Sequence, residues 1–170
     1  DRATDSETYF NYASTGADGA EAVLKYRHAR GSASLSYTFY SAMNNEVPLY
    51  AVPDEDQMTL GFPQHKVTAT GAFRPLPTLT LAPSATFLSE RFAYASLDAD
   101  GAAKLSRTAP SVLLDFFVTW RPENFSGLTM QAGVHNLLGT EYTFAQPYDG
   151  GYAPLPAVGR EFGLRIGFDH

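Results

Sequence analysis

Residues 161–168 alternate between apolar and polar or glycine positions almost without error. Phe162, Leu164, Ile166 and Phe168 fall on one side, and glycine or charged residues fall on the other. A period of two is the repeat of a β-strand that has one apolar and one polar face. The stretch therefore predicts a strand, and the rest of the chain must supply either protein or lipid to cover its apolar face.

The same two-residue period recurs along the chain, whereas apolar spacings of three and four do not. We therefore expect an all-β fold of about eight antiparallel strands. The glycine-rich stretch Ser14–Gly19 predicts a turn, and Pro83 predicts a bulge or weak spot because proline has no amide donor. The expected strands are Thr8–Tyr12, Ala20–Ala29, Ser32–Ala42, His65–Arg74, Thr78–Leu88, Pro110–Arg121, Gly127–His135 and residues 161–169.

The connections between the expected strands alternate in length after the first strand. The short ones are residues 30–31, 74–77 and 122–126, and the long ones are residues 43–63, 90–109 and 137–158. Short turns at one end and long loops at the other are typical of outer-membrane barrels. Strands of about ten residues span the hydrocarbon layer when they are tilted. The pattern favours an antiparallel up-and-down transmembrane β-barrel over a soluble β-sandwich, which also alternates.

A barrel gives the two strand faces different surroundings. Six charged residues are expected to face the lumen, either along a solute path or as a hydrated, paired wall: Lys25, Arg27, Lys66, Arg74, Asp115 and Arg165. Eight apolar residues of the last strands are expected to face lipid: Leu114, Phe116, Val118, Trp120, Phe162, Leu164, Ile166 and Phe168. Phe73, Leu79 and Leu128 join Trp120 and Phe168 near the short-turn end, where an interfacial girdle is expected.

Composition narrows the possible functions. A net charge of −6 and a pI of about 5.1 disfavour a nucleic-acid partner. No cysteine is present, and the histidines share no metal-binding spacing. The acidic groups Asp54–Asp56 and Asp98–Gly101 predict a solvated loop and a turn rather than cation sites. We expect no catalytic set, no metal site and no cofactor.

Several sequence blocks, in order and at suitable spacing, resemble one protein family. The segment from Thr8 to His170 is similar to the C-terminal part of the barrel of a TonB-dependent outer-membrane receptor. The blocks are Asn11 with Gly19–Ala22, the Pro-x-His-Lys strand entry in Phe62–Val67, the Leu-Asp strand Leu114–Thr119, the Asn-Leu-rich block Val134–Tyr142, and the Gly-Arg start of the last strand in Gly159–Phe162.

The resemblance implies an architecture and a function. Residues 1–170 would be a C-terminal segment of a barrel of about 22 strands, without the family's plug domain and energy-coupling segment. A closed barrel of about eight strands is the other geometric possibility. The implied location is the bacterial outer membrane, and the implied function is TonB-dependent uptake of a scarce solute such as a ferric siderophore or similar metal chelate. The implied partners are outer-membrane lipid, the plug and remaining barrel strands, and the TonB complex.

In this family the long loops form part of the ligand site. Aromatic rings can stack on planar ligand groups, and arginines can pair with an anionic chelate. The candidate ligand-binding residues are Tyr50, Arg91, Tyr94, Arg107, Tyr142, Tyr148 and Tyr152. Two alternatives remain open from the sequence: a small stand-alone barrel with a structural or adhesive role, and a soluble β-sandwich that binds carbohydrate.

Overall fold

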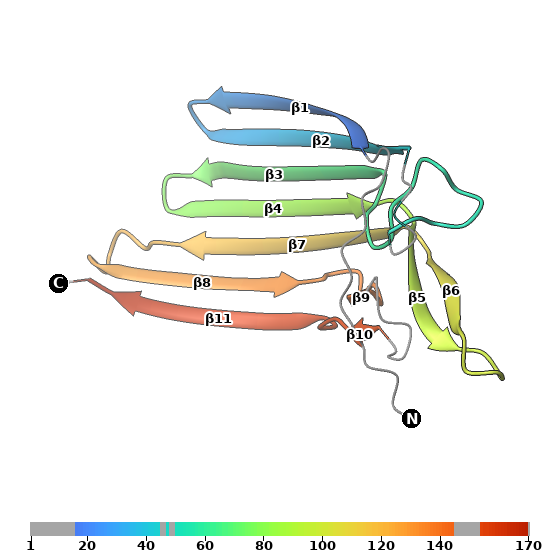
Figure 1. Cartoon of the computed structure of the whole chain (residues 1–170). Helices are drawn as coiled ribbons and strands as arrows, with labels where there is room; N and C mark the ends of the chain where they lie inside the picture. Colours follow the sequence, from blue (N-terminus) through green and yellow to red (C-terminus); the bar gives the residue numbers. More distant parts are fainter. Residues whose placement is uncertain (1–15, 45–46, 48–49, 145–153, 170) are drawn as a thin grey trace.

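The computed structural model describes residues 16–44, 47, 50–144 and 154–169, and the regular structure in them is β throughout (Figure 1). Seven strands form one antiparallel sheet in which spatial order follows chain order. They are β1 (Gly16–His28), β2 (Gly31–Met43), β3 (His65–Leu76), β4 (Leu79–Leu88), β7 (Ser111–Trp120), β8 (Leu128–His135) and β11 (Glu161–Phe168). Two hairpins lie outside this sheet: β5 (Arg91–Leu97) with β6 (Ala103–Thr108), and β9 (Thr143–Phe144) with β10 (Leu155–Pro156). The described residues contain no helix that is long and apolar enough to cross a membrane.

The connections of the sheet separate by length, as the sequence predicts. The short turns β1–β2, β3–β4 and β7–β8 all lie at the left end of the sheet in Figure 1, and the long connections lie at the right end. The apolar residues expected near the short turns are paired at this end of the sheet: Leu79 is opposite Trp120, and Leu128 is opposite Phe168. The strand bounds for this sheet agree closely with expectation, apart from the first strand, Thr8–Tyr12, which lies outside the described residues.

The prediction of a turn at Ser14–Gly19 is wrong for its described part. Gly16–Gly19 belongs to β1 and pairs with the end of β2, Tyr40–Met43. A β-carbon built on Gly19 would lie 2.9 Å from the Phe39 carbonyl oxygen, so glycine allows the two strands to approach here. The low strand propensity of glycine and aspartate suggested a turn, but these residues form a strand because they pair with β2.

The second long connection is also more regular than expected, because it contains the β5–β6 hairpin. Its tip is the turn predicted at Asp98–Gly101. The Asp98 carboxylate accepts hydrogen bonds from the backbone amides of Asp100 and Ala102 at 2.9 and 2.8 Å, and Gly101 adopts a φ of 83°. The acidic side chain therefore closes a turn, which confirms the interpretation that favoured a turn over a cation loop.

Pro83 interrupts the ladder between β3 and β4, as expected. Thr70 pairs with Ser84 and Phe73 pairs with Leu81, but the ladder has no paired residues between these two rungs. The register shift itself lies further along, between Phe73 and Leu76. The missing proline donor therefore weakens the ladder, and the bulge forms nearer the short turn.

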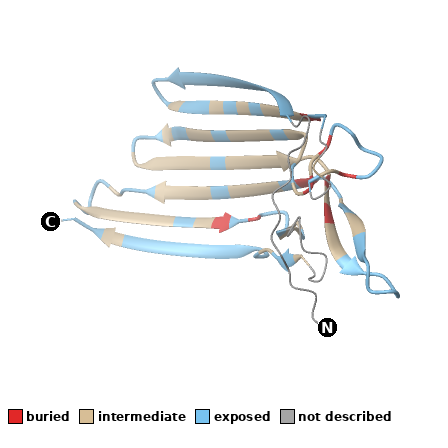
Figure 2. Cartoon of the chain, viewed as in Figure 1, coloured by how far each residue is buried: buried red, intermediate tan, exposed pale blue. Residues whose placement is uncertain are grey.

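The sheet of described strands is open. Within these residues β1 pairs with β2 alone and β11 pairs with β8 alone, so each leaves a free edge. The described strands do not form a closed small barrel, and they fit the alternative of a piece of a larger one. No second sheet of described residues covers the apolar face, on which Phe162 is 80% and Leu164 is 70% exposed (Figure 2). The β-sandwich alternative is wrong, because a sandwich buries the apolar faces of both its sheets.

The largest buried cluster of described residues lies in the loops and not on the sheet. We call it the loop core: Val52, Met58 and Leu60, packed against Phe92, Tyr94 and Leu105 of the β5–β6 hairpin. Leu60 has no exposed surface. The Gly61 amide donates a hydrogen bond to the Phe92 carbonyl at 2.7 Å. Two of the long connections are thereby joined into one packed unit.

Candidate functional site: the polar face of the sheet

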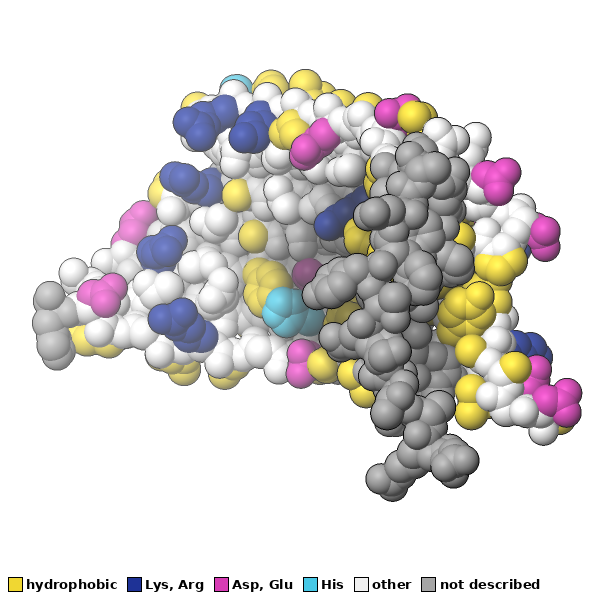
Figure 3. Space-filling view, viewed as in Figure 1, with side chains coloured by type: hydrophobic (Ala, Val, Ile, Leu, Met, Phe, Trp, Pro, Cys, Tyr) yellow, Lys and Arg dark blue, Asp and Glu magenta, His cyan; other side chains and the backbone are white. Residues whose placement is uncertain are grey.

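The expected lumen residues share one face of the sheet, which we call the polar face. Strand alternation and register place Lys25, Arg27, Lys66, Arg74, Asp115 and Arg165 opposite the exposed apolar side chains. Lysine and arginine side chains gather over the left half of this face, toward the short turns (Figure 3). Whether the polar face borders a lumen stays a prediction, but its basic character follows directly from the alternation.

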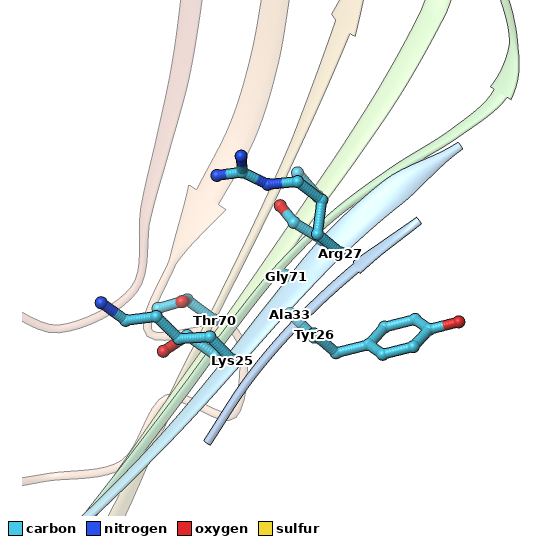
Figure 4. A pocket seen from close by; sticks show the side chains of 9 residues that line it. Lys25, Tyr26, Arg27, Ala33, Thr70 and Gly71 are labelled. Carbon is cyan, nitrogen blue, oxygen red and sulfur yellow. The ribbon is translucent and has the colours of Figure 1, made fainter. Parts of the chain in front are cut away.

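A basic pocket of about 490 Å³ lies on the polar face at the β1 edge (Figure 4). Lys25 and Arg27 project to the same side of the sheet as Thr70, whereas Tyr26 projects to the other side (Figure 4). Ser34 is opposite both Lys25 and Thr70 in the register, so hydroxyls lie beside the two cations. Ammonium, guanidinium and hydroxyl donors together suit an acceptor with anionic oxygens.

A second polar hollow, of about 320 Å³, lies at the other edge of the sheet, between β7, β8 and β11. Arg121 and Arg165 line it together with Asp169, Thr119, Thr129 and Gln131. The two hollows are therefore at opposite edges of the same face, and each contains two cations. Both lie toward the short-turn end of the sheet.

Asp115 is the best-connected side chain of the polar face. Its carboxylate accepts hydrogen bonds from the Ser84 hydroxyl at 3.1 Å and from the backbone amide of Asn136 at 2.9 Å. The His135 Nδ1 atom lies 3.6 Å from the same carboxylate. The sequence predicted an inward charge here. The structure shows a carboxylate that joins β4, β7 and the end of β8.

The block Val134–Tyr142, which carried much of the family resemblance, forms a turn held by side chains. Asn136 is buried and has a φ of 50°, and its amide group exchanges two hydrogen bonds of 2.9 Å with the backbone of Thr140. The Thr140 hydroxyl in turn donates to the Val112 carbonyl at 2.7 Å. Asparagine tolerates this left-handed backbone conformation and closes the turn with its own side chain. The motif thus has a structural role that sequence reasoning did not assign.

Phe117 covers a glycine on the polar face. A β-carbon built on Gly133 would lie 2.1 Å from Phe117 Cδ1, so this ring occupies the space of the missing side chain. The ring also meets His135 edge-on, with centroids 4.8 Å apart. An aromatic and imidazole pair therefore lies beside Asp115 in the middle of the basic face. Sequence reasoning missed this pair, although the glycine opposite an aromatic on neighbouring strands was a usable signal.

The candidate ligand residues of the loops lie in different environments. Arg91 is buried, and its Nε and Nη2 atoms have no hydrogen-bond partner among the described residues. Arg107 is exposed and forms an ion pair with Glu90. Tyr94 packs against the loop core, and Tyr50 belongs to the same unit because its carbonyl accepts from the Leu60 amide at 3.0 Å.

Of the three remaining loop candidates, the structure describes Tyr142. Tyr142 follows β8 and meets Phe144 edge-on at 5.6 Å. Tyr148 and Tyr152 lie outside the described residues. The acidic residues Asp54–Asp56 are exposed, as expected for a solvated loop. Within the described residues, no group of three or more histidine, aspartate or glutamate side chains is placed to hold a metal ion.

Comparison with known proteins identifies solved structures that share this fold. No protein-family model and no curated protein matches the chain. Among solved structures, the ferripyoverdine receptor of the outer membrane of Pseudomonas aeruginosa matches 89% of this chain with a TM-score of 0.72 and 12% identity. The siderophore receptor PiuA from Acinetobacter baumannii matches 91% with a TM-score of 0.66 and 16% identity. The FrpB iron transporter from Neisseria meningitidis matches 89% with a TM-score of 0.63 and 19% identity.

These matches cover only part of each solved structure: 19% of the ferripyoverdine receptor, 22% of PiuA and 23% of FrpB. The chain spans about a fifth of the length of the proteins it matches. It therefore has the fold of a barrel segment from TonB-dependent receptors, as its sequence resemblance implied. This agreement also accounts for the two free edges of the sheet, since a segment of a barrel must end on both sides.

Proposed function

We propose that this chain is a segment of the barrel wall of a TonB-dependent outer-membrane receptor that imports a ferric chelate. The observation that supports this most strongly is the contrast between the two faces of one open sheet. One face is apolar and is not covered by another described sheet, and the other is polar with an excess of cations. A soluble domain would cover the first face, whereas a membrane barrel surrounds it with lipid.

The apolar face is proposed to contact the hydrocarbon of the outer membrane. It includes Leu114, Phe116, Val118, Trp120, Phe162, Leu164, Ile166 and Phe168, and the last four are between 60% and 80% exposed. Trp120 and Phe168 lie near the short turns, where aromatic rings settle at a membrane interface. The outward band and the aromatic rim together fit a bacterial outer-membrane location.

The polar face is proposed to line the interior of the barrel. Lys25 and Arg27 at one edge and Arg121 and Arg165 at the other give the wall an excess of cations. An anionic chelate, or acidic groups on a plug domain, would complement this wall electrostatically. The plug, the remaining barrel strands and the TonB complex are accordingly the proposed partners.

The long loops are proposed to contribute to the chelate site. The two arginines of the β5–β6 hairpin differ in what they can offer. Glu90 already pairs with Arg107, whereas the buried Nε and Nη2 atoms of Arg91 lack an acceptor within the described residues. A buried guanidinium without an acceptor is costly. We therefore favour Arg91 over Arg107 as a contact for the anionic oxygens of a ligand.

The test uses the full-length protein. Outer-membrane fractions should contain it, its migration in a detergent gel should change on heating, and its deletion should reduce uptake of one or more ferric siderophores under iron limitation. Arg91→Gln should weaken binding of that siderophore by about tenfold, whereas Arg107→Gln should change it by less than about threefold. A protein that remains soluble without detergent, or uptake that is unchanged by deletion for every ferric chelate tried, would contradict the proposal.

A further inference from the structure

The apolar face is not uniformly filled. Two overlapping hollows of about 340 and 390 Å³ form one groove across β2, β3 and β4. Both hollows share Ala33, Gly71 and Pro83, which form its floor. Tyr26, Phe73 and Phe116 are its larger neighbours. We call this feature the apolar groove.

The sequence of three neighbouring strands, β2, β3 and β4, produces the apolar groove. Ala33 is opposite Gly71, and one rung away Ala69 is opposite Ala85, so small side chains adjoin on three strands. The Pro83 ring borders the hollow on the β4 side, and it lies 3.4 Å from the β-carbon position of Gly71. Beyond Pro83 the same row continues toward the other edge of the sheet with large side chains, Phe116, Val134 and Phe162.

The end of the groove near the β1–β2 turn is cationic. Arg30 and His28 line this end, and no acidic residue does. Arg30 forms no ion pair with a described residue. Its backbone is fixed, because its carbonyl accepts a hydrogen bond from the Arg74 amide at 2.7 Å. An apolar trough that ends at a guanidinium with no ion-pair partner among the described residues has two parts of different chemistry.

We propose that the apolar groove binds a phospholipid, with one acyl chain over Ala33, Gly71 and Pro83 and the phosphate at Arg30. The acyl chain suits the apolar lining of the trough, and the phosphate oxygens match the guanidinium fork, with the His28 ring lining the same end. The site lies at the short-turn end of the sheet, where a headgroup meets water at the rim of the barrel. This inference rests on the proposed function, because it requires the apolar face to lie in a membrane.

A lipid held here differs from the lipid that surrounds any barrel. Contact with hydrocarbon does not depend on a headgroup, so the trough alone cannot distinguish a phospholipid from a lipid that lacks a phosphate. The phosphate contact is made only where the groove reaches Arg30. A lipid with a phosphate should therefore stay on the protein when others are removed, and the same lipid without its headgroup should not.

The experiment measures retained lipid on the full-length protein by native mass spectrometry, after extraction from membranes and extensive detergent washing. The probes are phosphatidylglycerol and a diacylglycerol with the same chains. Phosphatidylglycerol should be retained at one copy, and diacylglycerol should be lost. Ala33→Leu, which fills the groove, and Arg30→Gln, which removes the cation, should each reduce retention about tenfold.

Two matched variants serve as controls. Ala132→Leu makes the same change on the apolar face of β8, outside the groove, and Arg74→Gln removes a cation at the same end of the sheet. Neither should change retention. Equal loss from Ala33→Leu and Ala132→Leu, retention unaffected by Arg30→Gln, or a photo-crosslinker at position 33 that captures a protein in place of lipid would overturn the proposal.

Membrane fractionation of the wild-type protein separates the two levels of failure. A protein that does not enter the membrane contradicts the proposed function and, with it, the lipid site. A protein that enters the membrane normally but shows no selective retention contradicts the lipid site alone.

Discussion

Large aliphatic side chains are buried in one region of this molecule and exposed in another. In the loop core, Leu60 is fully buried and Met58 is 3% exposed. On the sheet, Leu164 is 70% exposed and Ile166 is 61% exposed. One hydrophobic effect cannot favour both arrangements in water, because it removes apolar surface from water wherever it can. The loops are built to exclude water with their own side chains, and the apolar face of the sheet needs another medium to cover it.

The largest effect should come from placing charge on the apolar face. Leu164→Arg or Ile166→Asp should prevent insertion into the outer membrane, since an arginine at mid-depth costs about 2–4 kcal/mol and an aspartate somewhat less. The measurement is the yield of heat-modifiable protein in outer-membrane fractions. Gly163→Arg and Gly167→Asp are the matched controls, because both positions lie on the polar face with open space around them. Normal yield of both apolar-face variants would contradict the lipid-facing assignment.

A smaller and local effect is expected in the loop core. Leu60→Ala should destabilise residues 50–62 and the β5–β6 hairpin by about 2 kcal/mol, at the low end for a buried leucine because so small a core can partly collapse. Limited proteolysis should then cut the loops faster while the heat-modifiable barrel remains intact. Leu97→Ala in the same hairpin, where the side chain is 52% exposed, should leave the cleavage rate unchanged. Loss of the whole barrel from Leu60→Ala would show that the two regions do not fold independently.

Asp115 connects the sheet to the turn that follows β8, so it tests how sharply the sheet and the loops are separated. Asp115→Ala leaves the Ser84 and Asn136 donors without their acceptor and should cost about 1–2 kcal/mol. Hydrogen exchange should increase at residues 136–140 and stay unchanged in the loop core. Ser84→Ala removes only one of these hydrogen bonds and should have the smaller effect. Equal exchange changes in both places would mean that Asp115 supports the loops as a whole.

The smallest effect should come from the exposed ion pair of the hairpin. Arg107 and Glu90 have side chains that are 64% and 30% exposed, so water and salt screen their attraction. A double-mutant cycle with Arg107→Ala and Glu90→Ala should give a coupling free energy below about 1 kcal/mol, measured through protease resistance of the hairpin. A coupling as large as the Leu60→Ala effect would assign the stability of the loops to charge and not to burial.

Much of the sheet could be predicted from the sequence, because alternation depends only on the pleat and on what each face contacts. The strands of the last third of the chain, including 161–168, show the pattern clearly. The prediction failed at Gly16–Gly19, where glycine allows close strand approach and does not end the strand. It also missed the β5–β6 hairpin, since contacts with a loop some thirty residues earlier in the chain stabilise its short strands.

The candidate site was less predictable than the fold. The charged residues that were expected to share one face do so, because alternation alone assigns them, and their position toward a lumen stays a prediction. Their individual partners depend on register between strands, which places Ser84, Asp115 and Asn136 together from three distant parts of the sequence. The burial of Arg91 likewise depends on tertiary packing. The residue type at each position indicated what its side chain could do, but it did not indicate which side chains would lie beside it.

The loop core has a consequence for exchanging loops between proteins that share this fold. Val52, Met58 and Leu60 come from one loop, and Phe92, Tyr94 and Leu105 come from another. A graft that transplanted either loop alone would bring half of a hydrophobic cluster to a host that lacks the other half. The smallest transferable piece of this packed unit is therefore a pair of loops that are separated in the chain by β3 and β4. Chimaeras should therefore exchange both loops together, and natural recombination breakpoints should be sought outside the segment that contains them.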